Sequence, residues 1–256
     1  MIKREDIYAD LHTHSIFSKH AYSTIKENIE IAKENGLQYI AITDHFYGNG
    51  DELEKKNETN RIEYLEKSIR PYEDDIVVIG GTEFNLGQEM PFFHKIKDIK
   101  WRPIGVHSWF WDRENKTLED TYNAFANAIE NNKHNALAHI EREIHKLDNG
   151  KYGDKITNEI IEFYEKIIKI AKENNVFLEV NESSIRSNEC GGIARLKCWL
   201  TIAKENQNFI YLGTDAHYCK QVGDFSQTIN LLNEIKYPKE LILNCNLELL
   251  EKVFNN

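Results

Sequence analysis

Short apolar runs alternate with longer amphipathic runs along almost the whole chain of 256 residues. The short runs have the length and branched side chains of buried strands, and the longer runs repeat their apolar residues at helical spacing. The predicted strands span residues 7–11, 39–43, 76–80, 103–106, 136–139, 176–180 and 209–212, with a weaker eighth at 241–243. Strands that alternate with helices in this way predict a parallel sheet covered by helices.

Capping signals mark where several helices begin. Thr24-x-x-Glu27 forms a capping box followed by a stop at Gly36, and Thr117-x-x-Asp120 opens a second helix that runs to about residue 131. Further helices are expected at about 160–171, 193–206, 226–235 and 247–254, and loops at the polar stretches 48–60 and 148–157. No stretch of the chain marks a domain boundary.

Repeated strand–helix units close most simply into a TIM-like barrel, and a chain of this length suits a single such domain. We therefore expect an α/β fold in which residues 1–256 form one domain. An open, doubly wound sheet is the alternative. It is disfavoured because no glycine-rich phosphate loop follows the first predicted strand.

Composition excludes several classes of protein. No run of about 18 apolar residues is present to span a membrane, and the N-terminus lacks the apolar segment of a secretory signal. The net charge of −10 disfavours binding to nucleic acid or to anionic membranes. Cys190, Cys198, Cys219 and Cys245 have no metal-binding or disulfide-type spacing, so we expect reduced thiols in a cytoplasmic protein. The sequence is compatible with a homo-oligomer.

Histidines and carboxylates follow most of the predicted strands. Because the carboxyl ends of barrel strands meet at one rim, these side chains should converge on one site. Imidazole and carboxylate are ligands of zinc, manganese and iron ions, and nine such groups are too many for one ion. The predicted ligands are His12, His14, His20, His45, Glu83, His107, His139, Asp215 and His217. The remaining histidines, His94, His134 and His145, are expected on the surface or in loops.

The spacing of these residues supports a cluster of metals. His12 and His14, like Asp215 and His217, are two positions apart, so in an extended chain each pair lies on one face and can hold one ion. Polar neighbours are candidates to orient the imidazoles through hydrogen bonds. These candidates are Asp10, Asp44, Glu179 and Asn181.

Five stretches resemble the PHP (polymerase and histidinol phosphatase) family of metallophosphoesterases, and in particular its small stand-alone bacterial phosphatases. They are residues 10–14 (DLHTH), 18–24 (SKHAYST), 41–45 (AITDH), 178–184 (LEVNESS) and 212–217 (LGTDAH). The resemblance implies a distorted TIM-like (β/α)7 barrel that holds three divalent ions. One departure is Ile140, which follows His139 where the family usually has proline, so the adjoining substrate loop is expected to differ.

Carried over residue by residue, the resemblance implies which side chains hold each ion. It assigns the first ion to His12, His14, Glu83 and Asp215, the second to Glu83, His107 and His139, and the third to His20, His45 and His217. The ions are zinc, manganese or iron, since all three accept this donor set.

The implied activity is hydrolysis of small-molecule phosphate monoesters. A metal-activated hydroxide would attack phosphorus while the ions neutralise the phosphoryl charge, with Glu83, Asp215 and His217 acting through that hydroxide. An arginine fork suits a phosphate, and Arg142 and Arg186 are the candidates for this contact.

Other functions remain to be weighed. A dedicated histidinol-phosphate phosphatase would use the same metals and differ only in its substrate loops. A non-catalytic, metal-stabilised binding module would normally have lost some ligands, and none of the nine is missing. An exonuclease is disfavoured by the acidic charge and the lack of a polymerase domain. An amidohydrolase is disfavoured by the positions of the predicted ligands: Glu83 follows the third strand, and the motif after the strand at 209–212 is Asp215-x-His217.

Overall fold

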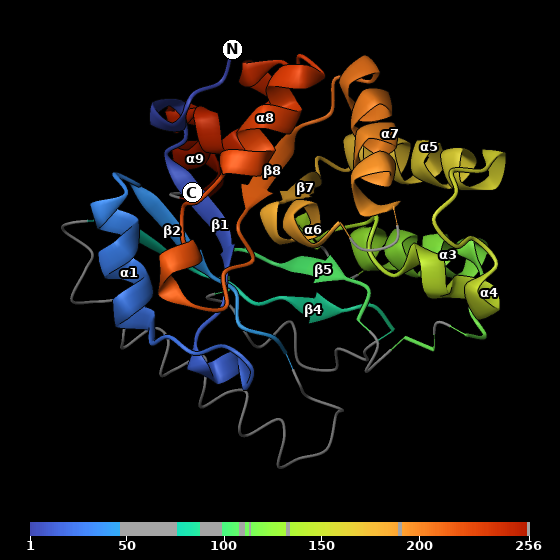
Figure 1. The fold of residues 1–256 in the computed structure, drawn as a ribbon, viewed down its shortest axis with the longest axis horizontal. Helices are drawn as coiled ribbons and strands as arrows, with labels where there is room; N and C mark the ends of the chain where they lie inside the picture. The colour runs from blue at the N-terminus through green and yellow to red at the C-terminus, as the bar shows by residue number, and fades with distance from the viewer. Residues whose placement is uncertain are drawn as a thin grey trace.

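Parallel strands occupy the interior of this computed structural model, which describes residues 1–46, 76–87, 99–107, 111–112, 114–131, 134–188 and 191–254 (Figure 1). One sheet has the strand order β1-β2-β3 and the other β4-β5-β6-β7-β8, and every pairing is parallel. The strands are β1 (Ala9–Thr13), β2 (Tyr39–Ile42), β3 (Val77–Gly80), β4 (Phe84–Asn85), β5 (Pro103–Gly105), β6 (Ala136–Leu137), β7 (Phe177–Asn181) and β8 (Ile210–Gly213). The predicted α/β fold with parallel strands is therefore confirmed.

Isolated bridges join the two sheets at both edges. Gly81, after β3, bridges Trp101, and Thr13, in β1, bridges Ala216, which follows β8. Among the described strands no continuous ladder links β3 to β4 or β8 to β1. The closed barrel expected from the sequence is therefore not confirmed, but the bridges bring the ends of β1 and β8 side by side.

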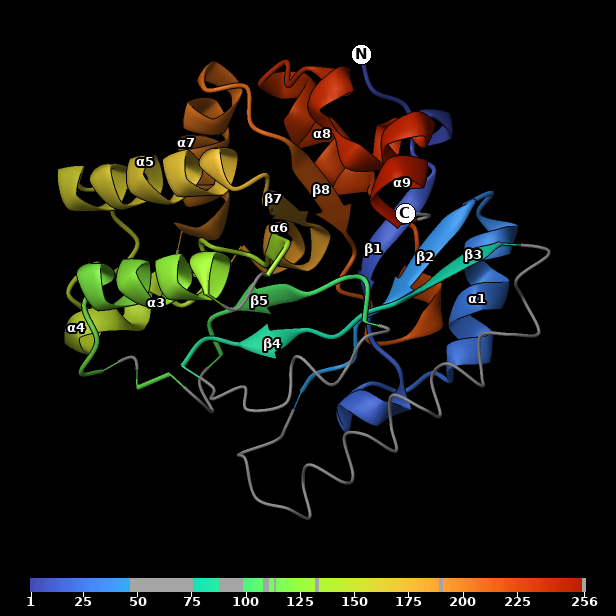
Figure 2. The ribbon, with the colours of Figure 1, turned by 180° about the vertical axis from the view of Figure 1, so that it is seen from behind.

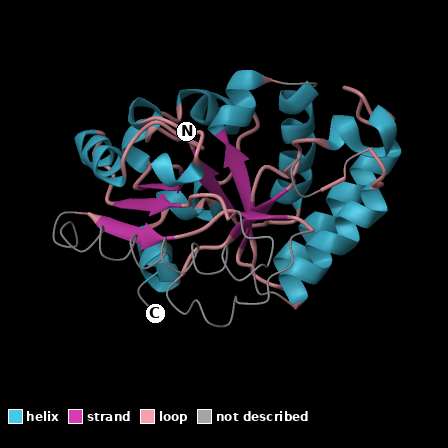
Figure 3. Cartoon of the chain, turned by 90° about the horizontal axis from the view of Figure 1, so that it is seen from below, coloured by secondary structure: helices cyan, strands magenta, loops and turns pink. Residues whose placement is uncertain are grey.

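Helices surround the sheets, and Figures 1 and 2 show α3, α5 and α7 gathered on one side of the strands and α1 on the other. Figure 3 shows the same arrangement from below, with helices above the strands and to their right. The helices are α1 (Ile25–Glu34), α3 (Leu118–Glu130), α4 (Leu147–Gly150), α5 (Asn158–Glu173), α6 (Glu182–Ser187), α7 (Gly192–Glu205), α8 (Ser226–Glu234) and α9 (Leu247–Phe254). None in the described ranges is long and apolar enough to cross a membrane.

Both predicted capping boxes are present. Thr24 caps α1 and Thr117 caps α3, and in each box the side chain three residues later bonds back to the cap backbone. Each such cap stabilises its helix by about 1 kcal/mol. The long α5 turns one apolar face inward, so that Ile160 and Ile167 are fully buried in the main core cluster between α3, α5, α7 and the larger sheet.

Three local predictions need correction. The first strand begins at Ala9 and includes His12, two residues later than the predicted run. The predicted eighth strand is wrong: residues 239–245 form two 3-10 turns, and only Ile242 makes a bridge, to Ile210. The stretch 148–157 is mostly turn but begins inside the short α4, and the loop predicted at 48–60 lies outside the described residues. Cys198, Cys219 and Cys245 are free, and Cys190 is also outside them.

His134 is buried, which corrects its predicted place on the surface. Only 2% of the residue is exposed, its Nδ1 lies 3.1 Å from the carbonyl oxygen of Arg102, and its ring packs edge-on against Phe84. His145 is half-buried in a 3-10 turn, and His94 lies outside the described residues. Burial lowers the pKa of His134 to about 4.

This burial predicts a pH dependence of stability. Below a pH of about 6.5 the unfolded chain takes up a proton at His134, whereas the folded chain does so only near pH 4, so stability is lost as the pH falls through this window. We expect His134 to lower the free energy of unfolding by about 2 kcal/mol between pH 6.5 and 4.5. Urea unfolding of the wild type and of His134→Gln at both pH values measures this contribution. An equal pH dependence in the two proteins would contradict it.

Candidate metal centre

Glu83 lies at the centre of the predicted ligands. It follows β3, is 1% exposed, and its Oε2 lies 3.3 Å from Nε2 of His12, 3.4 Å from Nε2 of His14 and 2.9 Å from Nδ1 of His45. This buried oxygen accepts no hydrogen bond within the described part of the chain. A buried carboxylate oxygen ringed by three imidazole nitrogens is suited to a cation.

The second oxygen of Glu83 faces the larger sheet. Its Oε1 lies 3.2 Å from Nε2 of His107, after β5, and 2.9 Å from Nε2 of His139, after β6. Asp215, after β8, approaches from a third side, with Oδ1 3.1 Å from Nε2 of His14. His139 and Asp215 have positive backbone φ angles of 31° and 53°, which non-glycine residues rarely adopt and which are often found at functional sites.

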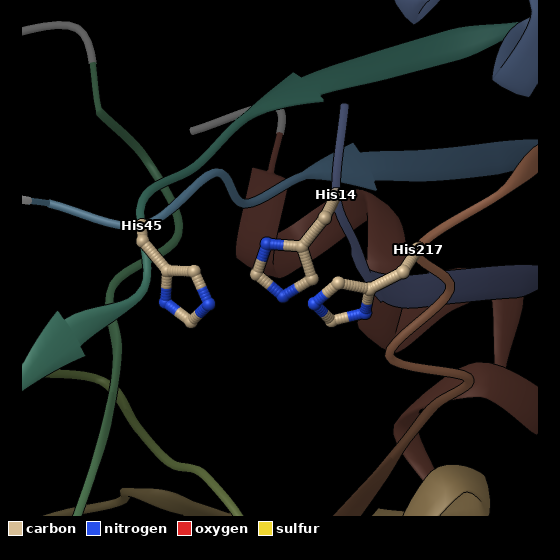
Figure 4. A group of neighbouring side chains, drawn as sticks. All are labelled: His14, His45 and His217. Carbon is tan, nitrogen blue, oxygen red and sulfur yellow. The ribbon is translucent and has the colours of Figure 1, made fainter. Parts of the chain in front are cut away.

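The rings of His14, His45 and His217 face one another across the outer part of the site (Figure 4). The His14 ring centroid lies 4.5 Å from that of His45 and 4.6 Å from that of His217. His20, on the loop after β1, stacks on the same group, 5.0 Å from His45 and 4.7 Å from His217. The structure thus brings together all nine side chains that the sequence singled out.

The donor atoms form three groups in which all atoms lie within 4.8 Å of one another. The groups are His12, His14 and Asp215; His45, Glu83 and His107; and His14, His45 and His217. The first group overlaps the residues expected around the first ion. His45 and His14 each belong to two groups, so the division of ligands among three particular ions stays a prediction.

Hydrogen bonds on the far side of the rings set the imidazole tautomers. Nδ1 of His12 lies 2.7 Å from Oε1 of Glu179, and Nδ1 of His14 lies 2.9 Å from Oγ of Ser18, whose own proton goes to Asp44. These partners accept, so each Nδ1 carries the proton and each Nε2 presents its lone pair to the centre.

His217 has the same arrangement, with its Nδ1 2.9 Å from the carbonyl oxygen of Asp215. The two Nε2 atoms of His12 and His14 lie only 3.0 Å apart. Two lone pairs at this distance repel each other unless a proton or a cation lies beside them. The residues present therefore fit divalent ions by donor type, by tautomer and by charge.

Electrostatics in the site favour the ionised forms of Glu83 and Asp215. Burial raises the pKa of Glu83, but the surrounding imidazoles, with His107 foremost, outweigh it and hold the pKa well below its usual range. For His14, burial and the neighbouring His45 both act to lower the pKa, which lies well below 6.5. His12 differs: Glu179 and the other carboxylates outweigh burial and raise its pKa well above 6.5. A proton and a metal ion therefore compete for His12.

Beside the donor atoms lies a cavity of about 200 Å³, lined among others by His20, His107, His217 and Arg142. Of the two arginines predicted to contact a substrate, only Arg142 lines it. Arg186 instead pairs with Asp224 at 2.9 Å. The sequence pattern did not single out Ser18, although its position in the stretch 18–24 and its hydroxyl were visible signals.

Fold and site together define a metal-binding α/β protein whose donor atoms meet at the carboxyl ends of parallel strands. Residues 10–183 match the PHP domain, and the chain belongs to the PHP domain family.

Similar proteins agree with this membership. A protein of Caldanaerobacter subterraneus named a probable phosphatase is 30% identical over 243 residues, which cover 93% of this chain and 87% of that protein. A probable phosphatase of Shewanella loihica is 27% identical over 92% of this chain and 88% of its own length. The crystal structure of histidinol phosphate phosphatase from Lactococcus lactis, complexed with zinc, L-histidinol and phosphate, matches with a TM-score of 0.59 at 19% identity, covering 90% of this chain and 94% of that one. This last likeness supports the fold alone.

Proposed function

We propose that the chain is a phosphatase that hydrolyses small-molecule phosphate monoesters at a trinuclear metal site. The observation that carries this proposal is the convergence of nine imidazole and carboxylate side chains, with Glu83 at their centre, beside a cavity that an arginine also lines. We further propose that residues 1–256 form one distorted (β/α)7 domain, because the donors come from both sheets.

Three divalent ions would be held by the nine side chains identified from the sequence. When bound, such ions lower the pKa of bound water towards about 7 and offset negative charge on the phosphoryl oxygens. The chain's own part is to place these ions, with Glu83 and Asp215 supplying negative charge. Glu179 and the Ser18–Asp44 pair hold the His12 and His14 rings in the tautomer that can ligate.

Arg142 is the side chain we propose for binding the substrate phosphate. Its Nη2 is 2.9 Å from Oδ2 of Asp215 and its Nε bonds to Ser184, whereas Nη1 donates to no group in the described ranges. Guanidinium N–H groups beside an ion cluster are suited to the oxygens of a phosphoryl group. Arg186 is less suited, because Asp224 and Glu182 already engage it.

The experiment that tests this function is phosphate release from a panel of esters, including histidinol phosphate and a generic aryl phosphate. Protein stripped with a chelator should be inactive, and reloading with Mn²⁺ or Zn²⁺ should restore hydrolysis. A strong preference for histidinol phosphate would identify the specialised phosphatase, and comparable rates would identify a generalist. No release from any ester by protein with verified metal content would overturn the proposal in favour of a binding module.

A further inference from the structure

Arg142 is held in place by side chains from the end of β7 and the first turn of α6. Its Nε donates to Oγ of Ser184 at 2.9 Å, and its Nη2 donates to Oδ1 of Asn181 at 3.1 Å. The same Nη2 forms the 2.9 Å ion pair with Oδ2 of Asp215. Three contacts on two nitrogens fix the plane of the guanidinium group.

Asn181 and Ser184 are themselves fixed. Asn181 is fully buried and caps α6, with its Oδ1 accepting a hydrogen bond from the backbone N–H of Ser184 at 2.8 Å. Its Nδ2 also lies 3.4 Å from Oδ2 of Asp215. Asn181 therefore ties the helix cap, Arg142 and a predicted metal ligand to one another.

The hydroxyl of Ser184 that accepts from Arg142 is itself shielded from water. Ser184 is 4% exposed and lies in α6. A serine oxygen has two lone pairs, so it can accept the N–H of Arg142 while its own proton points elsewhere. Arg142 is thus anchored to a buried side chain of α6.

We propose that Asn181 and Ser184 are positioning residues that fix Arg142, so that one edge of the guanidinium holds Asp215 while Nη1 is left for a phosphoryl oxygen. The inference rests on the proposed phosphatase function and deepens it. A long side chain that is already ordered loses less conformational freedom when it binds a ligand. The network should therefore contribute to phosphate affinity more than to the chemical step.

Ser184→Ala tests this role, and Ser187→Ala is its matched control. Ser187 lies three residues later on the same helix and is exposed, and within the described part of the chain its hydroxyl bonds only to the carbonyl of Ser184. For Ser184→Ala we expect KM for an aryl phosphate and Ki for inorganic phosphate to rise about fivefold, with kcat changed less than about twofold. Ser187→Ala should match the wild type, and Ser184→Thr, which keeps the hydroxyl, should restore both constants.

Metal content and thermal unfolding of each variant separate positioning from a general structural defect. If Ser184→Ala is poorly folded, Asn181→Ser serves instead, because serine also caps helices but is too short to reach Arg142. Wild-type KM and Ki in Ser184→Ala, or a rise shared by Ser187→Ala, would overturn the proposal. A wild-type enzyme that releases no phosphate would instead overturn the phosphatase function itself.

Discussion

Asp215→Asn and His45→Ala are each expected to lower kcat/KM at least about a thousandfold while the fold is retained. Asp215 supplies negative charge 3.1 Å from Nε2 of His14, and an amide of the same shape cannot replace that charge. His45 belongs to two of the three donor groups, so its loss disturbs both. Neither side chain takes part in a strand ladder.

Phosphate release, metal content and circular dichroism of the two variants measure this expectation. His145→Ala is the matched control, because His145 is half-buried in a turn and belongs to none of the three donor groups found among the described residues. The control should keep wild-type activity and metal content. Near-normal hydrolysis by either Asp215→Asn or His45→Ala would show that the site assignment is wrong.

Gly213→Ala should destabilise the protein by about 3 kcal/mol and also abolish activity. A Cβ atom at Gly213 would lie 2.3 Å from Oε1 of Glu179 and 2.4 Å from Cβ of His12. Both neighbours are fully buried, so neither can move aside without disturbing the ring of His12 and its hydrogen bond. The close approach of β8 to β1 thus depends on residue 213 being a glycine, which has no Cβ atom.

Urea unfolding and activity of Gly213→Ala can be set against those of Gly192→Ala. At Gly192 the nearest atom to an added Cβ is a carbonyl oxygen 3.8 Å away, which is an ordinary contact. We expect the stability of Gly192→Ala to differ little from that of the wild type. Equal stability of the two variants would mean that the sheets separate more easily at this point than the structure indicates.

The strand ends and the capped helices could be predicted from the sequence because each carries a local signal. The box formed by Thr24 and Glu27 places α1 without any tertiary contact. The convergence of distant ligands followed from one rule about parallel strands, which needs no knowledge of register. Glu179 was also predicted, from its position at a strand end, to orient an imidazole, and it contacts Nδ1 of His12. Asn181 was predicted for the same role but contacts Arg142 and Asp215 instead.

Features that depend on tertiary packing could not be predicted. The two-residue strand β4 and the short α6 have too few residues to show a period, and the apolar run at 241–243 pairs only through Ile242. His134 resembles a loop histidine until the neighbouring Phe84 covers it. The two sheets are joined by single bridges such as Thr13–Ala216, and an isolated bridge has no local sequence pattern from which it could be predicted.

The donor atoms come from both sides of the seam between the two sheets. His14 follows β1 of the smaller sheet and Asp215 follows β8 of the larger one, and within the described strands isolated bridges rather than a continuous ladder join the two sheets. An ion held between these side chains is therefore also a cross-link between two halves of the molecule. Binding of metal would then restrict the motion of one sheet relative to the other, so that the same donor atoms would serve both the rigidity of the fold and the chemistry of the site.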